Sequence, residues 1–282
     1  MIKEWTIKEL LEVTKKYFIQ KKVSEPRLSS ELLLAEILDL KRLDLYLKFD
    51  KLVSENELCK YRNLVKERIK GVPIQYLINR AEFFGLSFNI NDKVLIPRPE
   101  TEFIVEKSID FLKARKGGIL IDIGTGCGAI GIASSYYVND VEVIFSDISK
   151  DAMEITKENA ERLLGVDRKY SFNTGNLFEG IKVKGDIVTA NLPYLNREQM
   201  ENLQLEVTYE PGFALEGGED GLDIIKTFID SIGDYINKRG KVMIEFDDSG
   251  KEMLESYINE KGLENTFYKD YNNLYRYCVI NF

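Results

Sequence analysis

The sequence predicts an α/β protein in which a mostly parallel sheet, flanked by helices, follows a small helical domain. Three observations lead to this fold class. Up to Gly71 the apolar side chains recur at helical spacing. Beyond residue 118, short runs typical of β-strands alternate with helical segments, and a glycine-rich loop directly follows the first of those strands. A chain of 282 residues is long enough to form both parts.

The N-terminal region contains the start signals of three helices. Thr6 with Glu9, and Ser54 with Glu57, have the spacing of capping boxes, in which each side chain bonds the backbone of the other residue. Pro26 stands where a helix can begin, because a helix leaves its first N–H groups unpaired. A glycine and a proline end the helical pattern shortly before residue 78.

A short connector separates the helical region from the rest of the chain. Leu86, Phe88 and Ile90 alternate with polar residues, which predicts a hairpin, and Asn91-Asp92 is the expected turn. The predicted organisation is a helical domain over residues 1–78, a β-hairpin connector over 79–96 and an α/β domain over 97–282.

The C-terminal domain is expected to contain a sheet of seven strands. Five β-rich runs alternate with helical segments, which indicates right-handed βαβ units and parallel pairing; they are residues 119–123, 141–145, 170–173, 186–190 and 241–246. Residues 264–269 and 275–280 follow. The connection between these last two runs is too short for a helical crossover, so they are expected to pair antiparallel.

Composition excludes several classes of mechanism. The chain has no histidine, which removes Ser-His, Cys-His and His-metal chemistry. Cys59, Cys127 and Cys278 lie far apart and form no zinc or disulfide pattern, so no metal site is expected. The net charge of −8 argues against tight nucleic-acid binding. With no apolar run of membrane-spanning length and no secretory signal, we expect a cytoplasmic protein without a membrane partner.

The loop after the first strand of the sheet is a candidate cofactor site. Its alternate glycines let the backbone turn sharply and approach a ligand; the loop residues are Gly124, Thr125, Gly126, Cys127 and Gly128. Asp147 ends the next strand, where a carboxylate can accept hydrogen bonds from ribose hydroxyls. The loop alone is compatible with NAD, with S-adenosylmethionine, or with a tight turn that binds nothing.

The segment Asn191-Leu192-Pro193-Tyr194 is the candidate chemical site, because it follows a strand at the edge where α/β sheets bind ligands. An amide-type nitrogen is a poor nucleophile. The Asn191 side-chain oxygen and the Leu192 carbonyl can hold its two N–H groups and aim its lone pair, while Tyr194 stacks on the planar group. This chemistry, which needs no strong base, favours S-adenosylmethionine over NAD. The alternative is a proline-stopped turn with a buried tyrosine.

Together these segments closely resemble the release-factor glutamine N5-methyltransferases, the HemK/PrmC family. The resemblance covers about the central half of the chain, in order, through Gly71–Leu77, Val94–Glu102, Asp122–Gly128, Asn159–Ala160, Asn191–Tyr194, Glu210–Pro211 and Ala214–Leu222. The segment Pro97-Arg98-Pro99-Glu100-Thr101-Glu102 is the most specific of these.

The resemblance implies a seven-stranded, Rossmann-like methyltransferase domain that uses S-adenosylmethionine. It further implies that the substrate is the glutamine of the Gly-Gly-Gln motif of peptide chain release factors, which the helical domain would orient. The residues expected to hold the substrate are Asn191, Leu192, Pro193, Tyr194 and Arg98. Those expected to hold the cofactor are Gly124, Thr125, Gly126, Cys127, Gly128, Asp147, Asn176, Leu177 and Asn191.

Four positions depart from the family pattern. Leu192 replaces the usual first proline of the motif, although its backbone carbonyl remains. Asn176 stands where aspartate is common, and its side-chain oxygen can still accept a hydrogen bond. Asn79 replaces a glycine, and Glu245-Phe246-Asp247 replaces Glu-Ile-Gly.

Two other functions remain open at this point. Asn-Leu-Pro-Tyr also resembles the motif of adenine-N6 methyltransferases that act on RNA or DNA, although the acidic chain and the Arg98 segment count against them. The second is a non-catalytic protein that keeps the fold and binds the cofactor or a partner.

Overall fold

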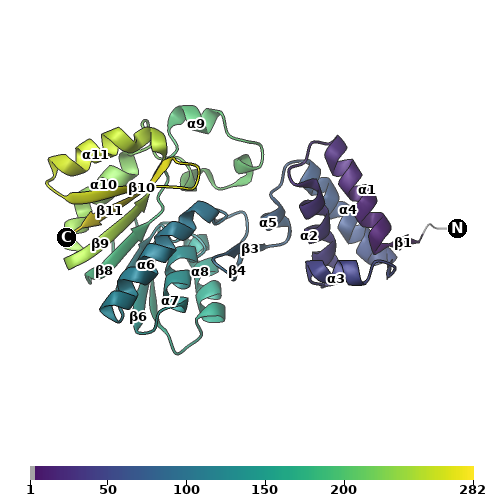
Figure 1. The fold of residues 1–282 in the computed structure, drawn as a ribbon, viewed down its shortest axis with the longest axis horizontal. Helices are drawn as coiled ribbons and strands as arrows, with labels where there is room; N and C mark the ends of the chain where they lie inside the picture. Colours follow the sequence, from purple (N-terminus) through teal and green to yellow (C-terminus); the bar gives the residue numbers. More distant parts are fainter. Residues whose placement is uncertain (1–3) are drawn as a thin grey trace. The chain divides into compact units, whose positions relative to one another are not determined.

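The computed structural model describes residues 4–282, which form two compact units (Figure 1). The first unit reaches Arg80 and also includes Gln204–Tyr209; the second contains Ala81–Leu203 and Glu210–Phe282. This division differs from the expected domains, because a segment from the middle of the C-terminal region belongs to the helical unit. Within the described residues, no helix has the length and apolar character needed to cross a membrane.

The first unit is helical, and two of its helices, α1 and α4, begin at the predicted capping boxes. The Thr6 hydroxyl accepts from the Glu9 N–H at 3.3 Å, and the Glu9 carboxylate accepts from the Thr6 N–H at 3.0 Å. Ser54 and Glu57 make the same reciprocal pair. The elements are β1 (Trp5–Thr6), α1 (Ile7–Gln20), α2 (Pro26–Leu38), α3 (Arg42–Leu47), β2 (Leu52–Val53), α4 (Glu55–Ile69), α5 (Ile74–Leu77) and the short 3₁₀ helix η2 (Val207–Tyr209).

The segment Gln204–Tyr209 is held to the helical unit by specific contacts. Arg68 is almost completely buried, and its guanidinium donates to the Glu206 carboxylate at 2.9 Å. The Tyr209 hydroxyl donates to the Lys70 carbonyl at 3.0 Å. A side chain at Gly71 would collide with Leu205, since a Cβ there would lie 2.6 Å from its Cγ. These contacts explain why the segment clusters with helices that precede it by more than a hundred residues.

The connector is the expected hairpin, made of β3 (Arg80–Phe83) and β4 (Leu86–Asn89). Its two strands are joined at Phe84-Gly85, both with positive φ. The predicted turn at Asn91-Asp92 is also present, directly after β4, where the Val94 N–H donates to the Asn91 carbonyl at 3.3 Å and the Lys93 N–H donates to the Asn91 side chain at 2.9 Å. Positive φ is unusual for phenylalanine. Here the Phe84 N–H donates to Glu102 at 2.8 Å, and the Phe84 carbonyl accepts from the Tyr137 hydroxyl at 3.1 Å. These distant partners stabilise a turn that local preference does not predict.

The second unit contains the expected seven-stranded sheet, in the order β10-β11-β9-β8-β5-β6-β7. Its strands are β5 (Gly118–Ile123), β6 (Val141–Asp147), β7 (Lys169–Thr174), β8 (Gly185–Ala190), β9 (Ile236–Glu245), β10 (Glu264–Lys269) and β11 (Tyr275–Asn281). Neighbours from β7 to β9 are parallel, and β11 is antiparallel to both β9 and β10, which confirms the predicted pairing. The strand β9 begins earlier than expected, at Ile236 rather than Lys241.

Helices cover both faces of this sheet (Figure 1). Ile121 and Ile123 of β5 share a core with α10 and α11, while Asp122, pointing to the other face, bonds the N–H of Gly131 in α7. The helix α6 lies on the α7 face, because Ser108 contacts Met243 of β9. The remaining elements are η1 (Pro99–Thr101), α6 (Glu102–Arg115), α7 (Ala129–Tyr136), α8 (Lys150–Leu163), α9 (Arg197–Glu201), η3 (Gly212–Ala214), α10 (Asp223–Ser231), η4 (Ile232–Asp234), η5 (Asp248–Gly250) and α11 (Lys251–Glu260).

Candidate active site

A pocket of about 370 Å³ lies at the carboxyl ends of β5, β6 and β8. The strands β5 and β8 are neighbours, with Ile123 opposite Ala190, so the loops that begin at Gly124 and Asn191 leave the sheet side by side. Strand order reverses here, since β6 follows β5 on one side and β8 lies on the other; such switch points bind ligands in α/β sheets. Expected site residues in its lining are Gly124, Gly126, Asp147, Asn176, Leu177, Asn191, Leu192 and Pro193.

The glycine loop is anchored from below by Asp122. This carboxylate is fully buried, and it accepts hydrogen bonds from Thr125 at 2.6 Å, Thr189 at 2.7 Å and the Gly131 N–H at 3.1 Å. Burial raises the pKa of Asp122 to about 6, although the hydrogen bonds oppose that shift. Asp122 therefore joins β5, β8 and α7 beneath the loop, and Thr125 is one of its anchors rather than a lining residue.

The helix α8 supports the same loop from the other side. Thr156 donates to the Gly126 carbonyl at 2.8 Å, and the Asn159 amide donates to the Cys127 carbonyl at 2.9 Å. The Asn159 side chain also pairs with both backbone groups of Asn89 in β4. Asn159 is completely buried, so each of these bonds satisfies a polar group that water does not reach.

Gly126 and Asp147 form the junction between the loop and β6. The φ angle of Gly126 is +60°, and a Cβ at this position would meet no atom within 4 Å, so glycine leaves this side of the pocket open. The Gly126 N–H donates to the Asp147 carboxylate at 2.9 Å, and the Ser149 N–H donates to its other oxygen at 2.9 Å. Burial raises the pKa of Asp147 above its usual value.

The next wall of the pocket combines a polar residue with apolar side chains. Asn176 and Leu177 follow β7, and Leu177 has a φ of +51° with its carbonyl accepting from the Ser146 hydroxyl at 3.1 Å. Ile148 and Phe213 also line the pocket, yet 63% and 54% of their surfaces are exposed. Exposed apolar side chains around a pocket suit a flat aromatic ligand such as a nucleobase.

The Asn191 segment is fixed to two residues outside the pocket. The Asn191 amide donates to the Thr101 hydroxyl at 3.1 Å, and the Tyr194 hydroxyl donates to Glu245 at 3.1 Å. Burial, together with the Glu245 carboxylate, holds the pKa of Tyr194 well above its usual value. Leu192 lies in the core, and a Cβ at Gly124 would be 3.1 Å from its Cδ2. Its side chain therefore contributes packing that a proline would not.

Arg98 lies against a carboxylate rather than in the pocket lining. Its guanidinium donates to Glu210 at 2.5 Å, and the Ile96 N–H donates to the same carboxylate at 3.2 Å. Glu210 is buried, which raises its pKa above the usual value even though the charge of Arg98 opposes this. The pair ties the Arg98 segment to the chain just after residues 204–209.

Three more of the expected residues do not line the pocket: Cys127, Gly128 and Tyr194. Burial raises the pKa of Cys127 to about 12, which keeps its thiol protonated and unreactive. Sequence reasoning missed several residues that do line it, namely Lys93, Val94, Leu95, Ile123, Ser146, Ile148, Ala152, Gly175, Phe213, Ala214, Glu216 and Ile224. Some of them fall inside the motifs that carry the resemblance, such as Val94, Leu95, Ala214 and Glu216, and that membership could have identified them.

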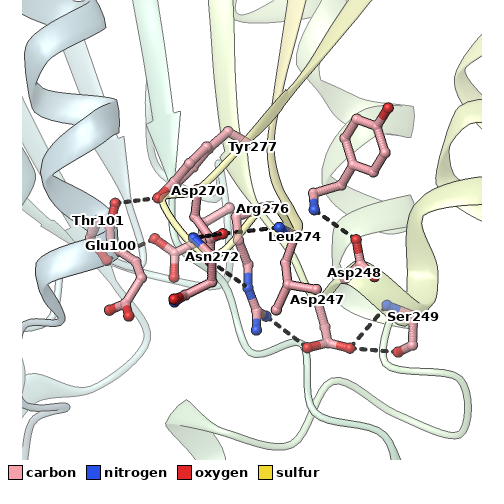
Figure 2. Close-up of polar contacts among 12 residues, drawn as sticks. Glu100, Thr101, Asp247, Asp248, Ser249, Asp270, Asn272, Leu274, Arg276 and Tyr277 are labelled. Atoms are coloured by element: carbon pink, nitrogen blue, oxygen red, sulfur yellow. Dashed lines mark hydrogen bonds and ion pairs between the residues drawn. The ribbon is translucent and has the colours of Figure 1, made fainter.

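Asp247, just after β9, stands where the family pattern has glycine, and its side chain binds Arg276 and Gln199. Arg276 of β11 donates to Asp247 at 2.7 Å and lies 3.7 Å from Asp270. Figure 2 shows this guanidinium between the two carboxylates, with Ser249 bonded to Asp247. Asp247 also accepts from Gln199 of α9 at 3.2 Å, so it joins α9 to β11. Within residues 4–282 no group of acidic or thiol side chains has the arrangement of a metal site.

Comparisons with known proteins find relatives over most of the chain. A family model for the PrmC N-terminal domain matches residues 9–78, and one for the methyltransferase small domain matches residues 105–208. The release factor glutamine methyltransferase of Geobacter sulfurreducens is 35% identical over 93% of this chain and 92% of its own. That of Leptospira interrogans is 33% identical over 98% of both chains. A methyltransferase structure from Pyrococcus furiosus shares the fold, with a TM-score of 0.52 and 20% identity over 71% of this chain and 89% of its own.

Proposed function

Because the chain belongs to the family of release factor glutamine methyltransferases, we propose that it methylates the N5 amide of the glutamine in the Gly-Gly-Gln motif of peptide chain release factors. The observation that carries this proposal is the Asn191 side chain beside the pocket. Its nitrogen donates to Thr101, and its oxygen takes no hydrogen bond from any residue between 4 and 282. An acceptor held in this way can receive an N–H from a substrate amide.

The cofactor is S-adenosylmethionine, and the residues present fit it. The pocket offers a glycine loop open to the ligand at Gly126, the Asp147 carboxylate for ribose hydroxyls, and apolar side chains at Ile148 and Leu177 for the base. S-adenosylmethionine supplies a methyl group on a positively charged sulfur, which a nitrogen lone pair can attack. Asn176 lines the same wall and has a side-chain amide that can bond the base.

The protein's contribution to the reaction is orientation. The Asn191 oxygen accepts one N–H of the substrate amide, and the Leu192 backbone carbonyl accepts the other, which holds the nitrogen and directs its lone pair. Tyr194, whose hydroxyl donates to Glu245, holds the other end of the Asn191 segment in place. As the bond between the nitrogen and the methyl carbon formed, the bond between that carbon and the sulfur would break, and its electron pair would leave the sulfur neutral. The nitrogen then loses one N–H proton to solvent water, so no strong base has to act first. This agrees with a chain that lacks histidine.

The proposal is tested by incubating intact release factor with the protein and S-adenosylmethionine, followed by mass spectrometry of the peptides. One added methyl mass on the Gly-Gly-Gln glutamine is expected. Asn191→Ala should lower the rate by about 100-fold or more, while cofactor affinity changes much less. A folded Asn191→Ala variant that keeps normal turnover, or a methyl group on another residue, would overturn the mechanism.

The helical unit is proposed to orient the release factor. Support comes from the match of residues 9–78 to the PrmC N-terminal domain and from exposed apolar side chains at Leu43 and Leu47 of α3. Replacing both leucines by serine should raise KM for the intact factor and leave KM for a short Gly-Gly-Gln peptide unchanged. An equal effect on both substrates would contradict the role. Lys15→Ser, an exposed change on α1, is the matched control.

Two further expectations complete the proposal. A protein that acts on release factors is expected in the cytoplasm, where translation ends. Its net charge of −8 makes tight nucleic-acid binding unfavourable, and the expected partner is the release factor. Methylation of free release factor at unchanged rate after nuclease treatment is the expected result, and loss of the activity would point to a nucleic-acid component.

A further inference from the structure

A continuous set of hydrogen bonds joins the two ends of the Asn191 segment through residues that do not line the pocket. The Asn191 amide donates to the Thr101 hydroxyl at 3.1 Å, and Thr101 donates to Glu245 at 2.7 Å. The other oxygen of Glu245 accepts from the Tyr194 hydroxyl at 3.1 Å. One carboxylate therefore binds both Asn191, through Thr101, and Tyr194.

Glu245 and Thr101, which connect Asn191 to Tyr194, are shielded from water and held by further contacts. Glu245, at the end of β9, is 1% exposed, and Thr101, at the end of η1, is 4% exposed. The Tyr277 hydroxyl donates to the Glu100 carbonyl at 2.7 Å, which anchors the turn next to Thr101, and Figure 2 shows this contact. The Tyr277 ring is stacked on Phe103, with ring centres 4.1 Å apart. Water can neither replace these bonds nor easily reorient the groups.

The order of donors and acceptors decides which way the Asn191 amide faces. Burial raises the pKa of Glu245, but the hydrogen bonds from Thr101 and Tyr194 oppose this shift. As a carboxylate, Glu245 only accepts hydrogen bonds, so the single hydroxyl hydrogen of Thr101 is directed at it. The Thr101 oxygen can then only accept from Asn191, which requires the NH₂ end of the amide. The oxygen of Asn191 is left for the substrate. If the amide were reversed, two oxygens would face each other at Thr101, and an NH₂ group would face the N–H groups of the substrate.

We propose that Glu245 is a positioning residue: through Thr101 it sets the amide orientation of Asn191, and it holds Tyr194 directly, so that the Asn191 segment presents an acceptor to the substrate amide. The proposal rests on the proposed function for the identity of that substrate. It adds a requirement for the hydroxyl of Thr101 and for the carboxylate of Glu245, neither of which touches the substrate.

The test compares two substitutions of similar size at one position. Thr101→Val removes the hydroxyl and keeps the shape, and it should lower kcat by at least about tenfold, the scale for losing an orienting contact. Thr101→Ser keeps the hydroxyl and should restore most of that loss. The dissociation constant of S-adenosylmethionine, measured by calorimetry, should change less than threefold in both. Glu245→Gln has one oxygen in place of the two that accept separately from Thr101 and Tyr194, so it should resemble Thr101→Val.

A double-variant experiment separates positioning from general stability. If Thr101 acts through Asn191, then Thr101→Val should have no further effect on kcat in an Asn191→Ala background. Ser108→Ala is the control: it removes another buried hydroxyl, from α6, that makes no contact with Asn191, and it should leave kcat unchanged. The proposal is overturned if Thr101→Val is as active as Thr101→Ser. It is also overturned if Thr101→Val lowers kcat by the same factor in the Asn191→Ala background as in the native protein.

A measurement without substrate tests the hydrogen bonds from Glu245 through Thr101 to Asn191, here called the relay, separately from the proposed function. The side-chain NH₂ of Asn191, identified by its absence in the NMR spectrum of Asn191→Ala, should exchange its hydrogens slowly in the native protein and Thr101→Ser. In Thr101→Val it should exchange at least about tenfold faster, because its acceptor is gone. Equal exchange in the three proteins overturns the relay. If the native protein does not methylate release factor but shows this exchange pattern, the proposed function fails and the relay stands.

Discussion

The backbone N–H of Gly126 donates to the carboxylate of Asp147 at 2.9 Å, and this bond joins the glycine loop after β5 to the end of β6. The glycine loop and Asp147, separated by about twenty residues in the sequence, therefore form one wall of the pocket. The carboxylate keeps lone pairs available on both oxygens after it has bound Gly126 and Ser149, since each oxygen can accept more than one hydrogen bond.

Asp147→Ala should weaken S-adenosylmethionine binding by about 1–3 kcal/mol, because the ribose loses a charged acceptor and Gly126 loses its partner. Asp147→Asn keeps an acceptor oxygen, so it should lose less affinity for S-adenosylmethionine than Asp147→Ala. Calorimetry gives the dissociation constants, with Asp151→Ala on the exposed face of α8 as the control. An unchanged constant for Asp147→Ala would show that the ribose binds elsewhere. Tighter binding of NAD than of S-adenosylmethionine would contradict the cofactor.

The buried Asp122 predicts a pH dependence of stability. Its pKa is about 6 in the folded protein against 3.8 for the free group, so the folded state holds the proton more tightly. The contribution of Asp122 to the free energy of unfolding is complete below about pH 4, and it is lost as the pH rises through about 6. The free energy of unfolding of the native protein, relative to Asp122→Asn, should therefore fall by about 3 kcal/mol between pH 4 and 7.

Urea unfolding at several pH values measures this difference. Asp110→Asn, which changes an exposed carboxylate of α6, serves as the control and should give a much flatter curve. A difference between native protein and Asp122→Asn that does not change with pH would show that folding does not raise the pKa of Asp122.

Arg98→Ala tests whether Arg98 binds substrate or stabilises the fold. The substitution leaves the Glu210 carboxylate, which is 2% exposed, without its cation, and should lower the free energy of unfolding by about 1–3 kcal/mol. Adding Glu210→Gln should recover part of this loss, because no unpaired charge remains. Thermal unfolding of the single and double variants measures both effects. Unchanged stability combined with a higher KM for release factor would instead indicate direct contact with the substrate.

Glu206→Ala should release Gln204–Tyr209 from the helical unit. Arg68 keeps bonds to the Val72 carbonyl and to Ser24, so we expect a moderate loss of about 1–3 kcal/mol in the free energy of unfolding. Limited proteolysis should cut this segment faster than in the native protein. Glu198→Ala, on the exposed side of α9, is the control and should have no such effect. Equal cleavage rates in the two variants would show that the ion pair does not hold the segment.

Local patterns predicted the elements whose contacts lie close together in the chain. The capping boxes at Thr6 and Ser54 join residues three apart, and both are present. The alternation of strands and helices predicted the sheet, because each βαβ unit has only one favourable hand. The turn predicted at Asn91-Asp92 is present as well. The turn that joins β3 to β4 at Phe84-Gly85 was not predicted, because Glu102 and Tyr137 supply its partners from elsewhere in the chain.

The sequence by itself determined the α/β class, the glycine loop, the Asp147 strand end and the Asn191 motif, since these depend on residues within one strand and the loop that follows it. Only the tertiary structure decided which distant side chains bond to these segments and to their neighbours. Glu245 meets Thr101 across 144 positions, Glu206 meets Arg68 across 138, and Glu210 meets Arg98 across 112. Buried polar groups need partners, but no local pattern says which distant residue will supply them, because strand order and register bring those residues together.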